Sequence, residues 1–437
     1  MQEITIHWFR RDLRLLDNTS LFHALKNNKN ILPIFIFDTF ILDELSSKKD
    51  TRVSFIYETL KNIKEELQTK FQSDIAVFYG KPMEIFQQLV KKHKITAVYT
   101  NEDYEPYGKK RDQEISDFLI SKNISFHLFK DHVIFKKGEI LKPDGKIYKV
   151  YTPYMRKWKE KMYQTDIKEL NLEIVSSNFI QNVSFPFPSL ESIGFEISNQ
   201  KVLSFQMSKT LLNSYAEKRD FPAIEGTSFI SPHLRFGTVS IRKLVNYAKE
   251  TKDPKQIYLN ELIWREFFMQ IFDACPETEK EPFKKPYNNI LWRNNEEEFK
   301  KWCDGKTGYP LVDAGMRELN ETGYMHNRVR MVVGSFLCKH LLIDWTWGER
   351  YFAEKLLDFE LSSNVGNWQW VAGCGADAAP YFRVFNPETQ LTKFDKDLKY
   401  VKKWIPEFGT NKYPKPIVEH KFARERVLKA YKDALGK

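Results

Sequence analysis

The sequence predicts an α/β N-terminal domain, with a doubly wound parallel five-stranded sheet, joined by a long connector to an all-α C-terminal domain. Three observations lead to this fold class. Over residues 1–128, short β-branched and aromatic runs alternate with helical patterns, which is typical of strand–helix–strand units. Residues 129–200 are rich in glycine, proline and mixed polar stretches, as expected of a connector. In residues 201–437 strand signals fade and amphipathic helical patterns dominate.

The strands of the sheet are expected where short apolar runs stand between turn residues. These runs are residues 4–9, 31–37, 74–79, 95–100 and 124–128. Helical patterns lie between them, for example at 52–70 and 83–92. Parallel strands need such crossover helices, because a hairpin turn cannot join two parallel neighbours.

The connector and the helical domain follow from a change of pattern near residue 129. The KPDG stretch at 142–145 and the FPFP stretch at 185–188 interrupt both helix and strand periodicity. Beyond residue 200, the patterns at 254–272 and 324–341 predict amphipathic helices. The three predicted parts are therefore 1–128, 129–200 and 201–437.

Length and charge limit the function classes. A chain of 437 residues is long enough for two hydrophobic cores and a large buried cofactor. Lysine and arginine together number 68 against 58 aspartate and glutamate, a net charge of +10. This charge suits a polyanionic partner, because counterions released from the polyanion drive binding. A general enrichment in lysine explains the charge equally well.

The cysteines and the apolar runs indicate the compartment. Four cysteines lie far apart, without a CxxC pair or histidines at metal-ligand spacing: Cys275, Cys303, Cys338 and Cys374. This usage predicts a reduced, cytoplasmic protein without a structural metal. The sequence starts with a predicted strand rather than a basic and apolar leader, and no apolar run approaches the roughly 18 residues of a membrane span. We expect neither secretion nor membrane insertion.

Two glycine motifs resemble nucleotide-binding signatures but lack the required context. The GKT triplet at 305–307 has lysine at position 300, where a phosphate loop has glycine, and no predicted strand precedes it. The GCG triplet at 373–375 follows a tryptophan-rich helical pattern rather than a strand. Neither motif predicts a phosphate loop or a dinucleotide fold.

Tryptophan is concentrated in the C-terminal half. Eight of the ten tryptophans lie beyond residue 260: Trp264, Trp292, Trp302, Trp345, Trp347, Trp368, Trp370 and Trp404. Indole rings stack on nucleobases and can lose single electrons, so one set of them can serve nucleic-acid binding and electron transfer. Core packing is the ordinary role of any one of them.

Two constellations on the predicted helices carry candidate chemistry. Glu261 and Trp264 are three residues apart, so a carboxylate and an indole share one helix face that can hold an extruded base. Arg330 and Asp358 can form a buried ion pair beside a flavin ring, to which Asn364 offers an amide. A plain amphipathic helix and an interhelical salt bridge are the alternative interpretations.

A hydroxyl-rich loop precedes a predicted helix at 226–232. Ser231 is expected to cap this helix, with Pro232 at its first position. The hydroxyl groups of Thr227 and Ser228, together with free backbone N–H groups, can hold a pyrophosphate. Helix capping alone explains a serine at position 231, but it explains the hydroxyl groups of Thr227 and Ser228 less well.

Taken together, these motifs resemble the photolyase and cryptochrome family along the whole chain, most closely the bacterial class I cyclobutane pyrimidine dimer photolyases. The matching stretches are residues 7–14, 225–231, 260–267, 307–317, 325–331 and 368–387. The resemblance implies FAD in the helical domain. The positions that match its contacts are Tyr215, Thr227, Ser228, Phe229, Ile230, Ser231, Tyr258, Arg265, Asn327, Arg330, Asp358, Phe359, Glu360 and Asn364.

The resemblance also implies the substrate and the reaction. Excited, fully reduced flavin would pass an electron to a pyrimidine dimer in UV-damaged DNA, the cyclobutane ring would open, and the electron would return, a carbon–carbon lyase reaction. A dimer with weakened pairing is cheaper to extrude than a normal base, and photolyases are a known example of base flipping. The positions that match the catalytic pocket are Glu261, Trp264, Asn327, Met331, Trp370 and Asn364.

DNA contacts and electron transfer are implied by further positions. Arg219, Arg328 and Arg383 are the candidates for contacts to the DNA backbone, in addition to Glu261, Trp264 and Asn327 from the pocket. The family's relay of three tryptophans matches Trp292, Trp345 and Trp368. We expect the protein to act as a monomer.

Several positions bear on the subclass. Asn327 and Met331 match the dimer-repairing class, since (6-4) photolyases and animal cryptochromes have histidines at both. Asn364 differs from the aspartate that is common in plant cryptochromes. Asn367 stands where class I enzymes usually have glycine and is similar to the DASH group. A cryptochrome-type blue-light photoreceptor and a DASH-like photolyase of single strands are the alternatives.

The antenna chromophore is the remaining part of the resemblance. In folate-binding relatives an Asn-Glu pair follows the Tyr-Glu seen here at 104–105, whereas this chain continues with Pro106 and Tyr107. Folate bound in that mode is therefore not expected. A different second chromophore or an empty site is the alternative.

Overall fold

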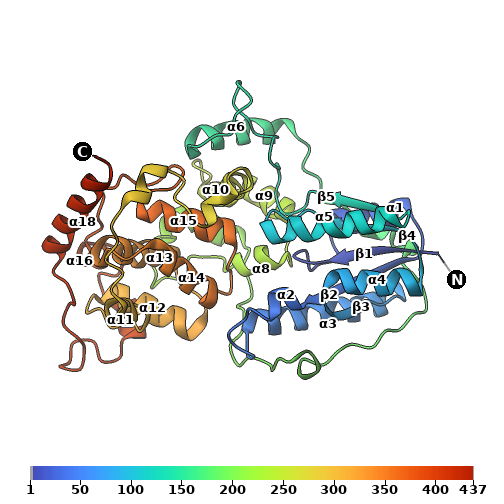
Figure 1. The fold of residues 1–437 in the computed structure, drawn as a ribbon, viewed down its shortest axis with the longest axis horizontal. Coiled ribbons are helices and arrows are strands. Elements are labelled where there is room, and N and C mark those ends of the chain that lie inside the picture. Colours follow the sequence, from blue (N-terminus) through green and yellow to red (C-terminus); the bar gives the residue numbers. More distant parts are fainter. Residues whose placement is uncertain (1–2, 437) are drawn as a thin grey trace. The chain divides into compact units, whose positions relative to one another are not determined.

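The computed structural model describes residues 3–436, and the chain forms two compact units from interleaved segments (Figure 1). Unit 1 comprises Met1–Lys136, Glu160–Phe205 and Ile230–Glu250. Unit 2 comprises Lys137–Lys159, Gln206–Phe229 and Thr251–Lys437. Each unit therefore draws on three segments of the chain, and the domain limits at 128 and 200 remain a prediction.

Unit 1 is built on a parallel sheet of five strands in the order β3-β2-β1-β4-β5. The strands are β1 (Glu3–Phe9), β2 (Ile31–Asp38), β3 (Ala76–Gly80), β4 (Lys94–Asn101) and β5 (Ser125–Phe129). The order reverses between β1 and β4, which defines a doubly wound sheet. The predicted fold class of the N-terminal part is confirmed.

Helices cover both faces of this sheet because alternate strand residues point in opposite directions. Phe9, Phe35 and Phe37 pack with α1 (Thr19–Asn27) and α3 (Thr51–Phe71). Ile6, Trp8 and neighbouring strand residues pack with α4 (Pro82–Lys92) and α5 (Pro106–Ser121) on the other face. Burial on both faces explains why the strands read as nearly continuous apolar runs.

Unit 1 also contains α2 (Thr39–Leu42), α8 (Ser231–Phe236) and α9 (Ile241–Lys249). The expectation that Ser231 caps α8 is wrong. Ile230 occupies the cap position, and its carbonyl oxygen already accepts a bond of 2.9 Å from the N–H of Leu234. The helical ladder thus starts one residue earlier than the proline position suggested, and Ser231 is the first helical residue.

Unit 2 is helical, as predicted for the C-terminal part. Its helices include α7 (Lys209–Lys218), α10 (Ile257–Ala274), α11 (Glu296–Cys303), α12 (Pro310–Thr322), α13 (Asn327–Ser335), α14 (Trp345–Lys355), α15 (Leu361–Ala372), α16 (Pro387–Phe394), α17 (Lys399–Trp404) and α18 (His420–Ala434). A large cluster of buried side chains from α12, α13, α14 and α15 forms its core. Helix α6 (Tyr151–Gln164) lies in the predicted connector and begins in unit 2.

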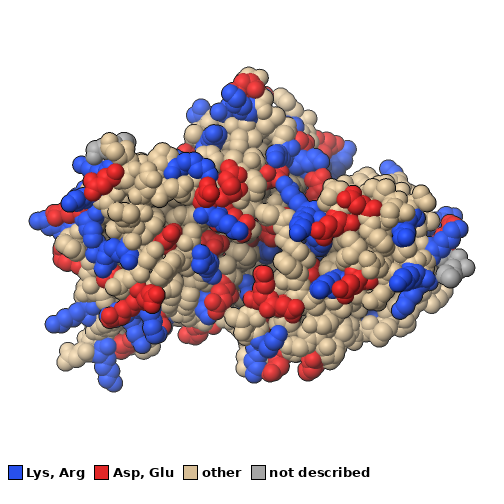
Figure 2. Space-filling model, viewed as in Figure 1, with Lys and Arg blue, Asp and Glu red and all other residues tan. Residues whose placement is uncertain are grey.

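Charge is mixed on the face of the molecule drawn in Figure 2, where lysine and arginine side chains are interspersed with acidic ones. The net charge of +10 is therefore not gathered into one basic field on this face. Within residues 3–436, no helix has the length and apolar character needed to cross a membrane.

One buried cation stands out in the core of unit 2. Lys339 lies in a π-helical turn (Phe336–Leu341) with 1% of its surface exposed. Its Nζ donates to the carbonyl oxygen of Ala372 at 2.7 Å and lies 3.8 Å from the ring centre of Tyr431. Burial lowers the pKa of Lys339 to about 7, well below its ordinary value of 10.5.

This lysine predicts a pH dependence of stability. Because its pKa is lower in the folded than in the unfolded chain, the unfolded chain binds more protons between pH 7 and 10.5, and stability rises with pH in that window. We expect the free energy of unfolding to increase more between pH 7 and pH 9 in the wild type than in Lys339→Met. Urea unfolding of both proteins at each pH measures the difference. Parallel pH profiles would show that Lys339 titrates normally.

Candidate functional site

Hydroxyl groups and tyrosine rings from three segments of unit 2 meet beside the loop at 226–229. The hydroxyl oxygens of Ser228 and Tyr258 are 3.0 Å apart, and those of Thr227 and Tyr324 are 3.5 Å apart. The ring of Tyr215, on α7, meets the ring of Tyr258 edge-on at 5.1 Å. The structure therefore brings the predicted pyrophosphate hydroxyls together with the predicted tyrosines of α7 and α10.

The predicted ion pair between Arg330 and Asp358 is confirmed. Two parallel bonds of 3.1 and 2.8 Å join the guanidinium of Arg330 to the carboxylate, and its Nε donates to the carbonyl oxygen of Met325 at 2.7 Å. Helix α13 supplies the arginine, and the loop before α15 supplies Asp358. This pair presents N–H donors from Arg330 and carboxylate acceptors from Asp358. Such a combination suits the pyrimidine edge of a flavin, which carries both donors and acceptors.

The start of α15 holds three further predicted contacts. Glu360 is buried and accepts bonds from the hydroxyls of Ser362 and Ser363 at 2.9 and 2.8 Å. The amide nitrogen of Asn364 donates to the carboxylate of Glu349 at 2.8 Å and to the Glu349 carbonyl at 3.0 Å. Burial raises the pKa of Glu349, an effect that the bond from Asn364 opposes. These bonds fix the orientation of the Asn364 amide.

The other predicted cofactor contacts lie on the same or neighbouring elements. Phe229 adopts a left-handed backbone conformation (φ 51°), and its ring lies 5.2 Å from that of Tyr324. Arg265 and Phe359 are half-buried in unit 2, on α10 and before α15. Ile230 and Ser231 belong to unit 1 and are placed with α8.

The predicted substrate face centres on Trp264 of α10. The ring of Tyr151 stacks on this indole at 3.6 Å, with 7° between the planes. The hydroxyl of Tyr151 donates to the carbonyl oxygen of Asn260 at 2.8 Å, one turn before Trp264. One face of the indole is therefore covered by Tyr151, which holds the ring in a fixed plane.

A row of alternating charges, which we call the charge ladder, lies beside this tryptophan: Glu261, Arg219, Asp220 and Arg328. Arg219 pairs with the carboxylate of Glu261, and its Nε lies 3.6 Å from a carboxylate oxygen of Asp220. Arg328 donates to that same oxygen of Asp220 at 2.7 Å. Burial raises the pKa of Glu261, whereas the neighbouring Arg219 lowers it. Glu261, Arg219 and Arg328 were predicted to bind DNA. Asp220, which links the two arginines, was not.

The remaining pocket residues are placed on α13 and α15. Asn327 is exposed at the first position of α13, and Met331 lies one turn further, 3.7 Å from Nη1 of Arg328. Trp370 is half-buried on α15. Arg383 is exposed in the segment after α15, with its guanidinium 5.3 Å from the ring centre of Phe385.

Two of the predicted relay tryptophans are buried in one core, and the third packs against it. Trp345 and Trp368 belong to the main cluster of unit 2, and Trp292 is partly buried beside them. Gly348, one turn after Trp345, admits the Trp368 ring so closely that a Cβ there would lie 2.1 Å from it. Trp292 meets Tyr431 edge-on at 6.1 Å. Trp302, not assigned to the relay, is 6.2 Å from Trp368.

The comparisons with known proteins identify the family. Residues 5–171 match the family model described as DNA photolyase, and residues 258–411 match the FAD binding domain of DNA photolyase. The deoxyribodipyrimidine photo-lyase of Vibrio cholerae is 34% identical, with 98% of this chain and 99% of that protein covered. The chain belongs to the DNA photolyase family. The predictions of the family, of FAD as cofactor and of a photolyase enzyme are confirmed at this level.

Solved structures of the photolyase family share the whole fold. A bacterial class III photolyase from Agrobacterium tumefaciens is 30% identical, with a TM-score of 0.88 over 100% of this chain and 98% of that one. A cryptochrome from Synechocystis is 26% identical, with a TM-score of 0.86 over 98% of this chain and 99% of that one. The similarity thus extends to photolyases and to a cryptochrome.

The residues of this family member fit a flavin nucleotide. The Arg330–Asp358 fork offers charge-assisted bonds, and Thr227 and Ser228 offer hydroxyls. Nε2 of His326, the residue that caps α13, is buried without a hydrogen-bond partner among the residues that the structure describes. A buried nitrogen without a partner is costly, so a polar group beside α13 would satisfy it.

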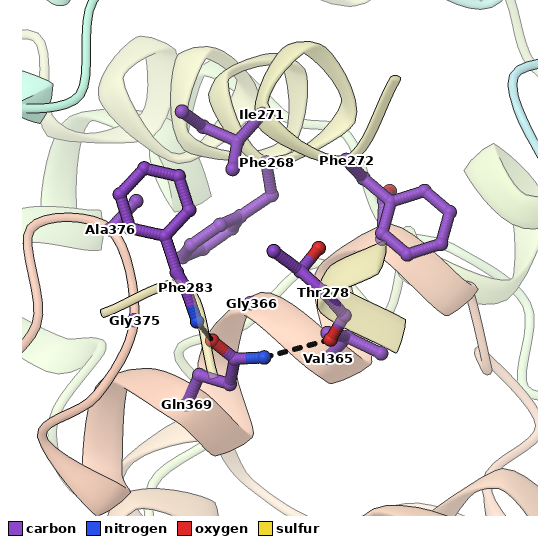
Figure 3. A pocket seen from close by; sticks show the side chains of 11 residues that line it. Phe268, Ile271, Phe272, Thr278, Phe283, Val365, Gly366, Gln369, Gly375 and Ala376 are labelled. Carbon is purple, nitrogen blue, oxygen red and sulfur yellow. Dashed lines mark hydrogen bonds between the residues drawn. The ribbon is translucent and has the colours of Figure 1, made fainter. Parts of the chain in front are cut away.

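A small apolar pocket lies behind the substrate face, between α10 and α15 (Figure 3). Phe268, Ile271 and Phe272 point into it from α10, and Gly366 comes so close that a Cβ there would lie 2.3 Å from the Phe268 ring. The Gln369 side chain closes one side by accepting from the N–H of Phe283 at 2.8 Å and donating to the Thr278 carbonyl at 2.8 Å. The pocket belongs to the packing that holds the two tryptophan-bearing helices together.

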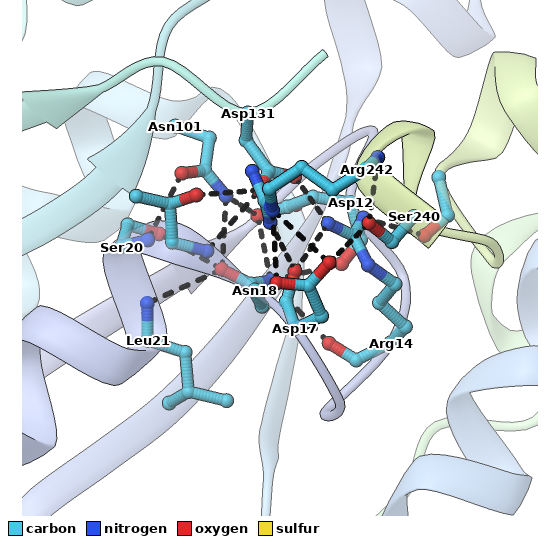
Figure 4. A network of polar contacts seen from close by, with 12 residues as sticks. Asp12, Arg14, Asp17, Asn18, Ser20, Leu21, Asn101, Asp131, Ser240 and Arg242 are labelled. Atoms are coloured by element: carbon cyan, nitrogen blue, oxygen red, sulfur yellow. Dashed lines mark hydrogen bonds and ion pairs between the residues drawn. The ribbon is translucent and has the colours of Figure 1, made fainter. Parts of the chain in front are cut away.

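In unit 1, the strand ends at the topological switch point are filled by a polar network (Figure 4). Asp131 accepts from Arg14 at 2.6 Å and from Arg242 at 2.8 Å, and Asn101 donates to Asp12 at 2.6 Å. Burial alone would raise the pKa of Asp131, but these guanidiniums hold it below its ordinary value. The network joins α9 to the loop after β1.

The loop that differs from the folate-binding members of the family forms the first turn of α5. The hydroxyl of Tyr107 donates to Asp38 at 2.5 Å, and its ring stacks on Phe40 at 4.3 Å. Gly108 packs on Asp103, where a Cβ would lie 2.5 Å away. Side chains of the chain itself therefore satisfy the polar groups of this turn, and the second chromophore remains a prediction.

Four residues of the site were missed from the sequence: Tyr151, Asp220, Tyr324 and Glu349. Tyr151 lies in the predicted connector, where turn residues obscured the helical pattern of 151–164. Asp220 and Glu349 act through partners that are distant in sequence or carry no motif. Tyr324 begins the predicted helical pattern at 324–341, but no spacing in the sequence relates it to Thr227 or Phe229, which it contacts.

Proposed function

We propose that this chain is a class I photolyase that repairs cyclobutane pyrimidine dimers in UV-damaged DNA under blue light. The observation that carries the proposal is the substrate face, where an immobilised indole, Trp264, lies next to a carboxylate and two arginines. Asn327 and Met331 on α13, in place of histidines, support dimers as the substrate. The photo-lyase name of the Vibrio cholerae relative supports the same reaction.

The residues divide the work in the proposed mechanism. Trp264, backed by Tyr151, stacks on the extruded dimer, and Glu261 accepts a bond from a base N–H. Arg219, Arg328 and Arg383 bind backbone phosphates, which positions the duplex without reading its sequence. Asn364 and the Arg330–Asp358 fork hold and orient the flavin ring.

Bound, reduced FAD would supply one electron to the dimer when it absorbs light. Two carbon–carbon bonds of the cyclobutane ring break and two pyrimidine double bonds re-form, so the electron returns without net redox change. Trp368, Trp345 and Trp292 carry electrons inward from the surface when the flavin needs to be reduced. Burial in the apolar core keeps water away from Trp345 and Trp368, whereas Trp292 stays partly exposed.

Two alternatives have support of their own. The similarity to the Synechocystis cryptochrome favours a blue-light photoreceptor, which would bind a partner in light without repair. The exposed Asn367 on α15 favours a DASH-like enzyme that repairs single strands. We place the protein in the cytoplasm as a monomer, the state in which such a face is free to meet DNA.

The test is repair of a defined thymine-dimer oligonucleotide by the reduced holoprotein under blue light. Double-stranded and single-stranded substrates are compared, each with a dark sample and an undamaged oligonucleotide as controls. We expect light-dependent restoration of the duplex. Repair of single strands alone would indicate the DASH-like enzyme. Repair of neither, with FAD bound and reduced, would contradict the proposal in favour of the photoreceptor.

A further inference from the structure

The charge ladder is neutral as a whole. Glu261 and Asp220 carry two negative charges, and Arg219 and Arg328 carry two positive charges, each arginine lying against at least one carboxylate. The two arginine side chains are largely screened from solvent, with 22% and 17% exposed, and about a third of each carboxylate side chain is exposed, 34% for Glu261 and 35% for Asp220. Two of the three arginines proposed to meet phosphate, Arg219 and Arg328, are thus already paired within the protein.

Asp220 is the member shared by both arginines. Its Oδ1 accepts from Arg328 at 2.7 Å and lies 3.6 Å from Nε of Arg219. No base-contacting role falls to it, since Glu261 and Trp264 supply the substrate face. Carboxylate and phosphate offer a guanidinium the same pattern of acceptors. Asp220 therefore gives Arg219 and Arg328 the kind of negatively charged partner that a DNA phosphate would give them.

The arginines are held from other sides as well. The guanidinium of Arg328 lies 4.4 Å from the ring centre of Phe394 and contacts the sulfur of Met331. Arg219 follows the last residue of α7, and its guanidinium lies 5.8 Å from the ring centre of Tyr215. Loss of Asp220 would therefore leave both guanidiniums near their places. Arg328 would lose its carboxylate partner, whereas Arg219 would keep Glu261, so the ladder would gain one net positive charge.

We propose that Asp220 determines the preference for damaged over undamaged DNA by competing with phosphates for Arg219 and Arg328. When undamaged DNA binds, a phosphate can only replace the carboxylate of Asp220 beside these arginines. This exchange of one anion for another contributes little binding free energy. A dimer that enters the pocket adds stacking and hydrogen bonds. These contacts hold the DNA where its phosphates displace Asp220 from the arginines. This inference rests on the proposed function, because it assumes DNA as the ligand.

The test compares Asp220→Asn with the wild type in binding to undamaged and dimer-containing duplexes in the dark, across a series of salt concentrations. We expect Asp220→Asn to bind undamaged duplex about fivefold more tightly at 0.1 M salt, with a salt slope steeper by about 0.9 for each phosphate gained. The ratio of damaged to undamaged affinity falls. Asp220→Glu, which keeps the charge, should retain the wild-type slope and ratio.

Two matched variants make the result specific. Glu297→Gln on α11 removes the same charge from an exposed pair with Lys301, so it reports the effect of net charge alone. Adding Arg328→Met to Asp220→Asn should return the salt slope toward the wild-type value, because the released cation is lost. Flavin content and urea unfolding confirm that each variant is folded.

The outcomes separate this inference from the proposed function. If Asp220→Asn changes undamaged binding no more than Glu297→Gln does, the inference is wrong. If the wild type neither prefers nor repairs dimer-containing DNA, the proposed function fails, whatever the slopes on undamaged DNA show. A steeper slope in Asp220→Asn with an unchanged affinity ratio would also overturn the inference, since Asp220 would then affect all DNA equally.

Discussion

Asp358→Asn is expected to lower the free energy of unfolding by about 3 kcal/mol, the range for breaking a buried ion pair by removing one partner. The substitution keeps the shape of the side chain but leaves the Arg330 guanidinium without its counter-charge. Only 6% of the Asp358 side chain and 25% of the Arg330 side chain are exposed, so water compensates little. We also expect most of the bound FAD to be lost. Urea unfolding and flavin absorbance per protein measure the two effects.

The matched control is Glu407→Gln. Arg317 forms the same kind of fork with Glu407, at 3.0 and 2.7 Å, but near the surface. Of the Glu407 side chain 28% is exposed, against 6% of Asp358, so water solvates Glu407 better and we expect a smaller loss of stability. This pair is not among the predicted FAD contacts. Equal losses of stability in both variants, or full flavin content in Asp358→Asn, would contradict the role given to the buried fork.

Trp292→Phe is expected to slow light-driven reduction of the oxidised flavin by about tenfold, a factor that corresponds to about 1.4 kcal/mol in a barrier. Trp292 is the partly exposed member of the relay, and phenylalanine is much harder to oxidise than tryptophan. Repair by chemically pre-reduced enzyme should remain nearly intact, because that reaction does not need the relay. Flavin absorbance under steady blue light and dimer repair after chemical reduction provide the two readouts.

Trp404→Phe serves as the control for this variant. Trp404 is a partly buried tryptophan that packs against the same core but is not part of the predicted relay. It should leave photoreduction unchanged. If Trp292→Phe impaired repair and photoreduction to the same extent, Trp292 would have a structural role instead. Unaffected photoreduction would indicate another path by which electrons reach Trp368. The buried Trp302, whose ring centre lies 6.2 Å from that of Trp368, is the first intermediate to test.

The sheet was largely predictable from the sequence. The strands begin and end within two residues of the predicted limits, because burial on both faces produces uniform apolar runs that turn residues interrupt. The predicted helices at 52–70 and 83–92 match α3 and α4 within one residue, whereas the helix limits in unit 2 were less accurate. The pattern at 324–341 indicated one helix, whereas His326 caps α13 and the last six residues form a π-helical turn. Side-chain capping and a changed hydrogen-bond ladder leave the apolar periodicity almost unaltered.

The site was predictable where a motif or a close spacing carried it. Glu261 and Trp264 share a helix face, and the Arg330–Asp358 pair formed as expected. Contacts that cross long stretches of chain were not predictable. Arg328 and Asp220 are 108 residues apart, and Tyr151 reaches Trp264 from a stretch whose composition resembles a connector. Spacing along the chain contains no information on such pairs.

The polar network of unit 1 affects how the protein can be synthesised and divided. Asp131 shares its carboxylate between Arg14 and Arg242, and Ser240 donates to Asp17 in the same network. The N-terminal sheet therefore lacks two of its partners until the ribosome has released residue 242. A fragment that stops at residue 136, where the first segment of unit 1 ends, would keep Asp131 but lack Arg242, and so would leave a buried anion without its second cation. Separate expression of the sheet unit thus requires residues 231–249 in addition to the segment 160–205, supplied in the same chain or as peptides in trans.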